Sequence, residues 1–104
     1  MRIINAVEAL PRARNGEVLG KQLLRCGTSV GANYRAACRA RSTADFIAKL
    51  GIVEEEADET IYWMELLVEA GFVKAPKLKL LMQEADELVA IVVASINTTR
   101  GHTR

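Results

Sequence analysis

Residues 42–71 read STADFIAKLGIVEEEADETIYWMELLVEAG. Mostly apolar residues recur there at alternating intervals of four and three, at Phe46, Leu50, Val53, Ala57, Thr60, Met64 and Leu67. This spacing places them on one face of an α-helix. Ser42 with Asp45 three residues later has the shape of a helix-capping box, and Gly71 is a typical helix stop. The stretch therefore predicts one helix of about 40 Å.

Two further stretches repeat this alternation of four and three. Between residues 15 and 40 it falls on Leu19, Leu23, Cys26, Val30, Asn33, Ala37 and Ala40. From Pro76, a good first-turn residue, it falls on Leu78, Leu81, Ala85, Leu88, Val92, Ser95 and Thr99. Residues 2–10 form a shorter apolar repeat that ends before Pro11, which cannot continue a helix interior. Short connections make consecutive helices antiparallel neighbours.

We therefore predict an all-α, antiparallel up-and-down four-helix bundle with a short first helix. A chain of 104 residues fits a single domain over residues 1–104, and we expect residues 99–104 to form a disordered tail. Because the first helix is short, the longer helices would keep apolar surface exposed, which favours a homo-oligomer.

Glycines recur inside the second predicted helix, where each lowers helix stability by up to about 1 kcal/mol relative to alanine. Gly20, Gly27 and Gly31 lie on one strip of that helix. Such a strip needs a physical reason, and close approach by another helix or by a bulky side chain supplies one. An aromatic side chain such as Trp63 is a candidate to lodge there.

The net charge of +1 hides a strong asymmetry along the chain. Residues 1–41 hold eight Lys or Arg against two acidic residues, a net charge of +6, whereas residues 42–72 hold one against eight, a net charge of −7. A basic helix beside an acidic one indicates mutual attraction more than an uncompensated nucleic-acid footprint. No apolar run reaches about eighteen residues and no leader pattern is evident, so we expect a cytoplasmic protein without a membrane partner.

The residue types offer few candidates for a disulfide, a catalytic site or a metal site. Cys26 and Cys38 lie about 18 Å apart on one helix, too far to form a disulfide, and we expect both to be buried. The only histidine, His102, lies in the expected tail, so no oriented base for nucleophilic catalysis is apparent. We expect no enzyme activity, small-molecule substrate, metal or cofactor. The alternative is an acidic metal site built from Glu56, Glu59, Glu84 and Glu87.

Several polar and aromatic residues are candidates for structural or interface roles. If the second and third helices turn near residues 41–42, Arg25 lies within reach of Glu56 or Glu59, either as a register-fixing pair or as an ordinary surface pair. Trp63 is either an interface anchor or a core residue. The full candidate set is Arg25, Asn33, Tyr34, Arg35, Glu56, Glu59, Tyr62 and Trp63. The cations most free to contact nucleic acid are Arg12, Arg14, Arg39 and Arg41.

Three segments also resemble a known family. QLLRCGTSVGANYR at residues 22–35, DFIAKL at 45–50 and EADETIYWMELL at 56–67 are similar, in this order, to the four-helix-bundle proteins related to the 23S rRNA intervening-sequence protein. The similarity covers residues 10–100. The chain departs from the family at Cys26, where serine is usual, and at Glu55 and Ile61, where relatives often carry a basic residue.

The resemblance implies a bacterial bundle that assembles into a homopentameric ring. Some relatives are encoded inside intervening segments of large-subunit rRNA genes, and a structurally similar protein is an accessory factor that binds nucleic acid and a reverse transcriptase. Most members have no established role. We therefore expect a non-enzymatic homo-oligomeric binding or scaffold module, with a protein, RNA or DNA partner. The alternative is an RNA- or DNA-binding accessory protein linked to rRNA intervening sequences or to a reverse transcriptase.

Overall fold

The computed structural model describes residues 2–8, 10 and 14–102, which form four helices and, over these residues, no strand. The helices are α1 (Arg2–Glu8), α2 (Arg14–Cys38), α3 (Thr43–Glu69) and α4 (Ala75–His102). The all-helical prediction is confirmed, and α1 is as short as expected. None of these helices has the length and apolarity that a membrane crossing requires.

The ends of α3 follow the capping signals in the sequence. Ser42 has an extended backbone, and its hydroxyl accepts a hydrogen bond of 3.0 Å from the Asp45 amide. At the other end Gly71 has a φ of +80°, a conformation that glycine adopts without strain. The Phe72 amide then donates to the Leu67 carbonyl at 3.0 Å, which closes the helix in the manner of a Schellman motif.

The C-terminal tail departs from the prediction. Helix α4 continues to His102, so the expectation of disorder was wrong for residues 99–102, while residues 103–104 lie outside the described part. Thr99 is half-buried there and lines a hollow together with residues at the start of α3. Its hydroxyl donates to the Ser95 carbonyl at 2.8 Å, a bond within α4.

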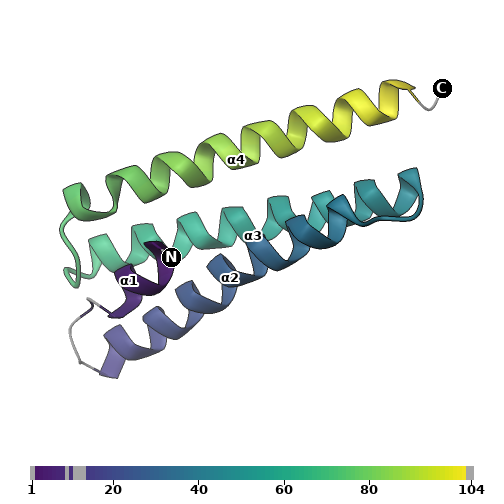
Figure 1. The fold of residues 1–104 in the computed structure, drawn as a ribbon. Coiled ribbons are helices and arrows are strands. Elements are labelled where there is room, and N and C mark those ends of the chain that lie inside the picture. The colour runs from purple at the N-terminus through teal and green to yellow at the C-terminus, as the bar shows by residue number, and fades with distance from the viewer. Residues whose placement is uncertain (1, 9, 11–13, 103–104) are drawn as a thin grey trace.

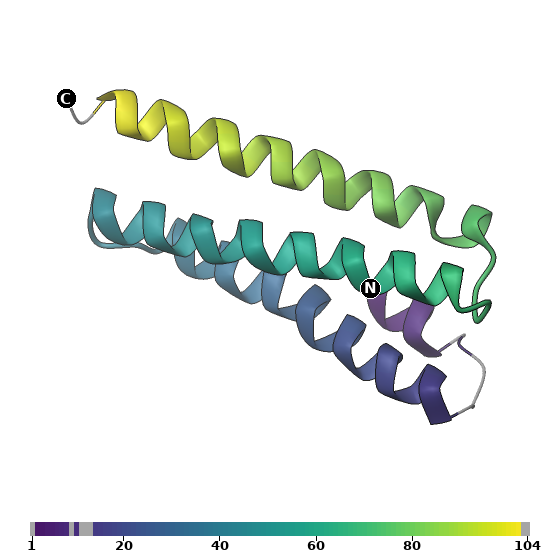
Figure 2. The same cartoon turned by 180° about the vertical axis from the view of Figure 1, so that it is seen from behind.

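The three long helices form an open V rather than a closed square. The chain reverses direction between α2 and α3 and again between α3 and α4, and α3 lies between the other two (Figures 1 and 2). Helix α3 contacts both neighbours, whereas no Cα atoms of α2 and α4 come within 8 Å of each other. The short α1 touches α2 and α4 at one end of this opening. The arrangement therefore has four helices in cross-section at one end and three at the other.

The buried core divides in the same way. One cluster lies beneath α1 and draws on all four helices, with the buried residues Ile3, Leu23, Met64, Leu67 and Leu78. The second lies toward the α2–α3 turn and draws on three helices, with the buried residues Ala37, Leu50, Val53, Val92 and Ile96. The apolar face of each long helix thus contributes to both clusters, but α1 covers only the four-helix cluster.

Candidate interaction surfaces

The glycine strip of α2 is where α1 packs. A Cβ atom at Gly27 would lie 2.5 Å from Cγ1 of Ile3, and one at Gly20 would lie 3.1 Å from Cδ1 of Leu10. The expectation that a second helix approaches this strip closely is confirmed. The aromatic candidate was wrong: aliphatic side chains of the first segment lie against Gly20 and Gly27, and Trp63 does not.

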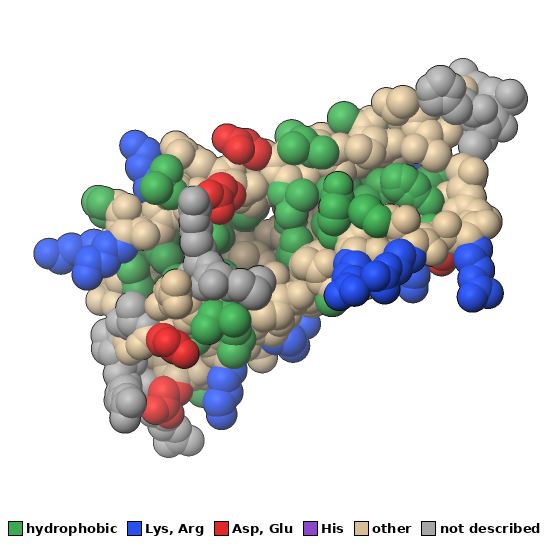
Figure 3. Space-filling view, in the orientation of Figure 1, with side chains coloured by type: hydrophobic (Ala, Val, Ile, Leu, Met, Phe, Trp, Pro, Cys, Tyr) green, Lys and Arg blue, Asp and Glu red, His purple; other side chains and the backbone are tan. Residues whose placement is uncertain are grey.

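Beyond α1 the same strip is uncovered. A Cβ atom at Gly31 would meet no other atom within 4 Å. We call the uncovered part of the space between α2 and α4 the open groove. A cavity of about 170 Å³ marks its start, lined by Ile3, Gly27, Val30, Ala57, Thr60, Leu81, Glu84, Ala85 and Leu88. Hydrophobic side chains gather along this opening, and Lys and Arg side chains follow its α2 edge (Figure 3).

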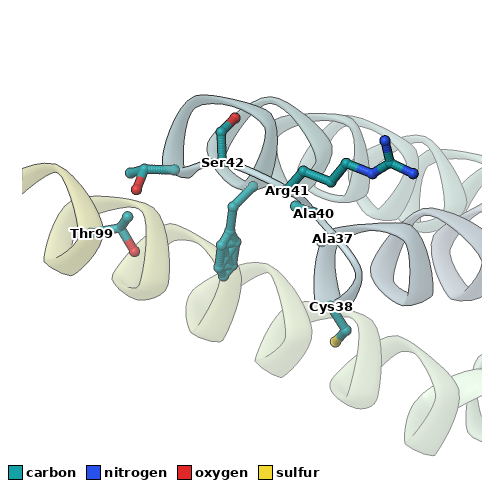
Figure 4. A pocket seen from close by; sticks show the side chains of 8 residues that line it. Ala37, Cys38, Ala40, Arg41, Ser42 and Thr99 are labelled. Carbon is teal, nitrogen blue, oxygen red and sulfur yellow. The ribbon is translucent and has the colours of Figure 1, made fainter.

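A hollow at the α2–α3 turn forms the far end of the open groove. Cys38 and Thr99 line it from α2 and α4, and Phe46 lines it from α3 (Figure 4). Cys38 is exposed whereas Cys26 is buried, so the expectation that both cysteines are buried was wrong for Cys38. The reason is that α1 does not extend far enough to cover this part of α2.

Basic residues follow the α2 edge of the open groove. Arg35 stands four residues after Gly31 in α2, and Arg39 follows directly after the end of that helix at Cys38. Both are exposed, as is Arg41 in the turn. No ion pair links any of the three to another described residue. Of the other nucleic-acid candidates, Arg12 and the side chain of Arg14 lie outside the described residues.

The opposite side of the V presents a ridge formed by the outer face of α3. Its apolar members are Ile52, 37 % exposed, and Tyr62, 55 % exposed, and Leu66 is half-buried beside them. The ring of Tyr62 meets that of Trp63 edge-on, with 5.0 Å between the ring centroids. We call residues 52, 55, 59, 62 and 66, which share this helix face, the α3 ridge; its Glu59 is paired with Arg25 of α2. Figure 2 views the molecule from this side.

An ion-pair cluster joins α2 to α3. The Arg25 guanidinium lies 3.6 Å from Oε2 of Glu56 and 3.3 Å from Oε1 of Glu59, so the predicted pairing is present with both acids. Arg25 Nη2 also donates to the Cys26 sulfur at 3.2 Å. Burial, reinforced by the negative charge of Glu59 and opposed by Arg25, raises the pKa of the Cys26 thiol to about 11. Cys26 is therefore held as a neutral, unreactive thiol.

The acidic metal site considered as an alternative is not assembled. Among the described residues, the one group of potential ligands is Cys26 with Glu56 and Glu59, whose ligand atoms lie within 4.8 Å of one another. The Arg25 guanidinium already supplies a positive charge at that place. Glu84 and Glu87 do not join this group, because α4 packs on the other side of α3.

The remaining candidates have separate environments. Asn33 donates to the carbonyl and hydroxyl oxygens of Ser29, both at 3.0 Å, so its contacts stay within α2. Tyr34 is 45 % exposed on the α2 strip. Trp63 is half-buried against the core cluster beneath α1, yet its Nε1 is buried without a hydrogen-bond partner among the described residues. Ile52 was not among the sequence candidates; its signal is an apolar residue on the α3 face that also carries Glu55 and Tyr62.

This chain is similar to a known protein family and to a solved structure. A model of the family described as 23S rRNA-intervening sequence protein matches residues 1–94. A solved structure from Bacteroides thetaiotaomicron, a protein of unknown function from the S23 ribosomal protein family, is 39 % identical to the chain. The two structures superpose with a TM-score of 0.85, over 91 % of this chain and 88 % of the Bacteroides chain. No curated protein sequence matches.

Proposed function

Because this chain belongs to the 23S rRNA-intervening sequence protein family, we propose that it is a non-catalytic, self-associating helical module. In this proposal it assembles in the cytoplasm into a homo-oligomer, with a pentameric ring favoured. The assembly then serves as a scaffold that binds a protein or nucleic acid. The proposal assigns structural or interface roles to Arg25, Asn33, Tyr34, Arg35, Glu56, Glu59, Tyr62 and Trp63.

The open groove is the observation that carries this proposal. Hydrophobic side chains line the opening beyond α1, where Tyr34 is 45 % exposed (Figure 3), and the ridge on the other side exposes 55 % of Tyr62. Exposed apolar patches on two sides of so small a molecule are typical of interaction surfaces. Aromatic residues are also enriched at the centres of such contacts.

Light scattering coupled to size-exclusion chromatography tests the assembly. A pentamer has five times the 11.4 kDa mass of one chain. We expect a mass well above that of one chain, independent of ionic strength to the extent that apolar contacts dominate. A single-chain mass throughout the micromolar range contradicts the proposal.

RNA or DNA binding is the second candidate function, favoured by Arg35, Arg39 and Arg41, which are exposed at the end of α2 and in its turn and form no ion pair with another residue that the structure describes. If they contact phosphates, affinity falls steeply as salt rises, with a slope set by the number of phosphates neutralised. Fluorescence anisotropy with a structured RNA and a single strand measures this. We expect Arg39→Ala with Arg41→Ala to weaken binding at every sequence, and Lys74→Ala at the other end of the molecule to have less effect. No affinity at low salt rules this candidate out.

A further inference from the structure

We infer that the open groove of one copy receives the α3 ridge of a second copy. This inference rests on the proposed self-association and adds to it the two surfaces that meet. The contact is heterologous, because each copy offers a groove to one neighbour and a ridge to another.

An unfilled helix position supports this pairing. Helices α2 and α4 each pack on α3 but not on each other, and the space between them is hollowed where the cavity of about 170 Å³ lies (Figure 3). At the covered end, α1 takes the fourth position of the bundle and lies against Gly20 and Gly27. At the open end the same position is empty beside Gly31. A helix inserted there would complete four-helix packing along the whole molecule.

Charge complementarity selects the α3 ridge as the occupant. The α2 edge of the open groove carries Arg35 and Arg39, both exposed, in a segment with a net charge of +6. The ridge carries Glu55 and the Arg25-paired Glu59 between Ile52 and Tyr62, with exposed Asp58 beside them, in a segment with a net charge of −7. The ridge therefore offers an apolar stripe flanked by carboxylates to a groove whose α2 edge carries guanidinium groups, while Glu84 lines the α4 side of its covered end.

A contact of this type is compatible with a closed assembly. A contact between two different surfaces repeats from copy to copy and generates a ring when its rotation closes. A contact between identical surfaces would stop at a dimer. Groove-to-ridge docking thus provides the kind of interface that a ring of any odd number of copies requires.

The test uses full-length variants that block one surface each. Gly31→Trp fills the open groove, and the free space around this position lets the monomer accept the side chain. Ile52→Lys combined with Tyr62→Ser disrupts the ridge at two exposed positions. The matched control is Gly101→Trp, because Gly101 is exposed near the end of α4 and a Cβ atom there also meets nothing within 4 Å. Circular dichroism verifies that each variant stays helical.

We expect each blocked variant to need at least about tenfold more protein to assemble, while the control assembles like the wild type. An equimolar mixture of the two blocked variants is the decisive sample. It still contains one intact groove and one intact ridge, so it should form a dimer of twice 11.4 kDa and no larger species. A second groove variant, Arg35→Glu with Arg39→Glu, should weaken assembly in the same way through charge repulsion.

The outcomes separate the two claims. If the wild type assembles and both blocked variants keep its mass, the groove-to-ridge contact is overturned and self-association stands. A monomeric wild type removes both. If the blocked variants are monomeric but their mixture stays monomeric too, the contact is not heterologous and the inference fails. A Gly31→Trp variant that assembles normally but loses RNA affinity would assign the groove to nucleic acid instead.

Discussion

The two ends of the space between α2 and α4 share one surface but differ in what covers it. At the covered end the strip of small residues lies against α1, so close that a Cβ atom at Gly27 would sit 2.5 Å from Ile3. At the open end Gly31 has no neighbour within 4 Å. The core beneath α1 draws on four helices, and the core near the α2–α3 turn draws on three.

This difference shows that one sequence signal has two physical meanings. A helical glycine that touches a neighbouring side chain exchanges helix propensity for close packing. A helical glycine beside empty space loses helix propensity with no compensation inside the same chain. Substitutions at the two positions should therefore have opposite effects on the free energy of unfolding, provided that assembly is removed from the measurement. The ridge variant Ile52→Lys with Tyr62→Ser, which the groove-to-ridge inference expects to be monomeric, is the background for these measurements.

Gly27→Leu should have the largest effect in that background. The new side chain overlaps Ile3, so α1 must move off α2 and its buried residue must return to water. We expect the free energy of unfolding to fall by about 2–3 kcal/mol, as is typical of overpacked sites. Urea denaturation followed by circular dichroism measures this.

Gly31→Leu is the matched comparison for Gly27→Leu, because it places the same side chain four residues further along α2 in open space. It should leave stability unchanged or slightly raised. Equal losses at the two positions would show that α1 does not lie against this strip in solution.

The two cysteines extend the comparison to pH. Native Cys26 has a pKa raised from 9.0 to about 11, so the unfolded chain loses this proton first as pH rises. Unfolding is then favoured between pH 9 and 11, and the free energy of unfolding should fall by up to about 1.4 kcal/mol per pH unit from this group alone. The measurement is the difference in pH slope between the wild type and Cys26→Ala, which cancels other titrating groups. Below pH 9 the two slopes should coincide.

Cys38→Ser serves as the control for this slope, because its side chain is exposed and leaves the environment of Cys26 intact. A thiol reagent gives an independent reading in the monomeric background. One thiol per chain should react quickly at pH 8, and the second only in denaturant. Rapid reaction of both thiols in the folded protein would contradict the burial of Cys26.

Local signals in the sequence predicted the helices and much of their register. The Ser42 cap and the Gly71 stop depend on neighbours a few residues away. The pairing of Arg25 with the acids of α3 depends on the short turn that makes α2 and α3 antiparallel neighbours. The exposure of Cys38 could not be predicted, because it depends on how far α1 extends over α2. The half-buried position of Thr99 near the end of α4 could not be predicted either, because the hollow that it lines includes residues of α2 and α3.

Gly31→Ala should change stability less than Gly27→Leu does, and in the opposite direction. The added methyl group meets no atom, so the variant gains helix propensity without a steric cost. In the monomeric background we expect the free energy of unfolding to rise by about 0.5–1 kcal/mol. Gly20→Ala tests the intermediate case, because its methyl group would lie 3.1 Å from the flexible end of Leu10. A Gly31→Ala variant less stable than its parent would indicate that another segment of the same chain covers the open groove.

The smallest expected effect concerns the ion pair between Arg25 and Glu59. This pair joins α2 to α3 and does not line the open groove. Their side chains are 52 % and 46 % exposed, so solvent screens the attraction. A double-mutant cycle with Arg25→Ala and Glu59→Ala should give a coupling of about 0.5 kcal/mol that decreases in high salt. The same cycle repeated with Gly27→Leu should give the same value, because the pair joins α2 to α3 without α1. A coupling that disappears when α1 is displaced would mean that α1 sets the register of the α2–α3 hairpin, and the two ends of the molecule could then no longer be treated as independent.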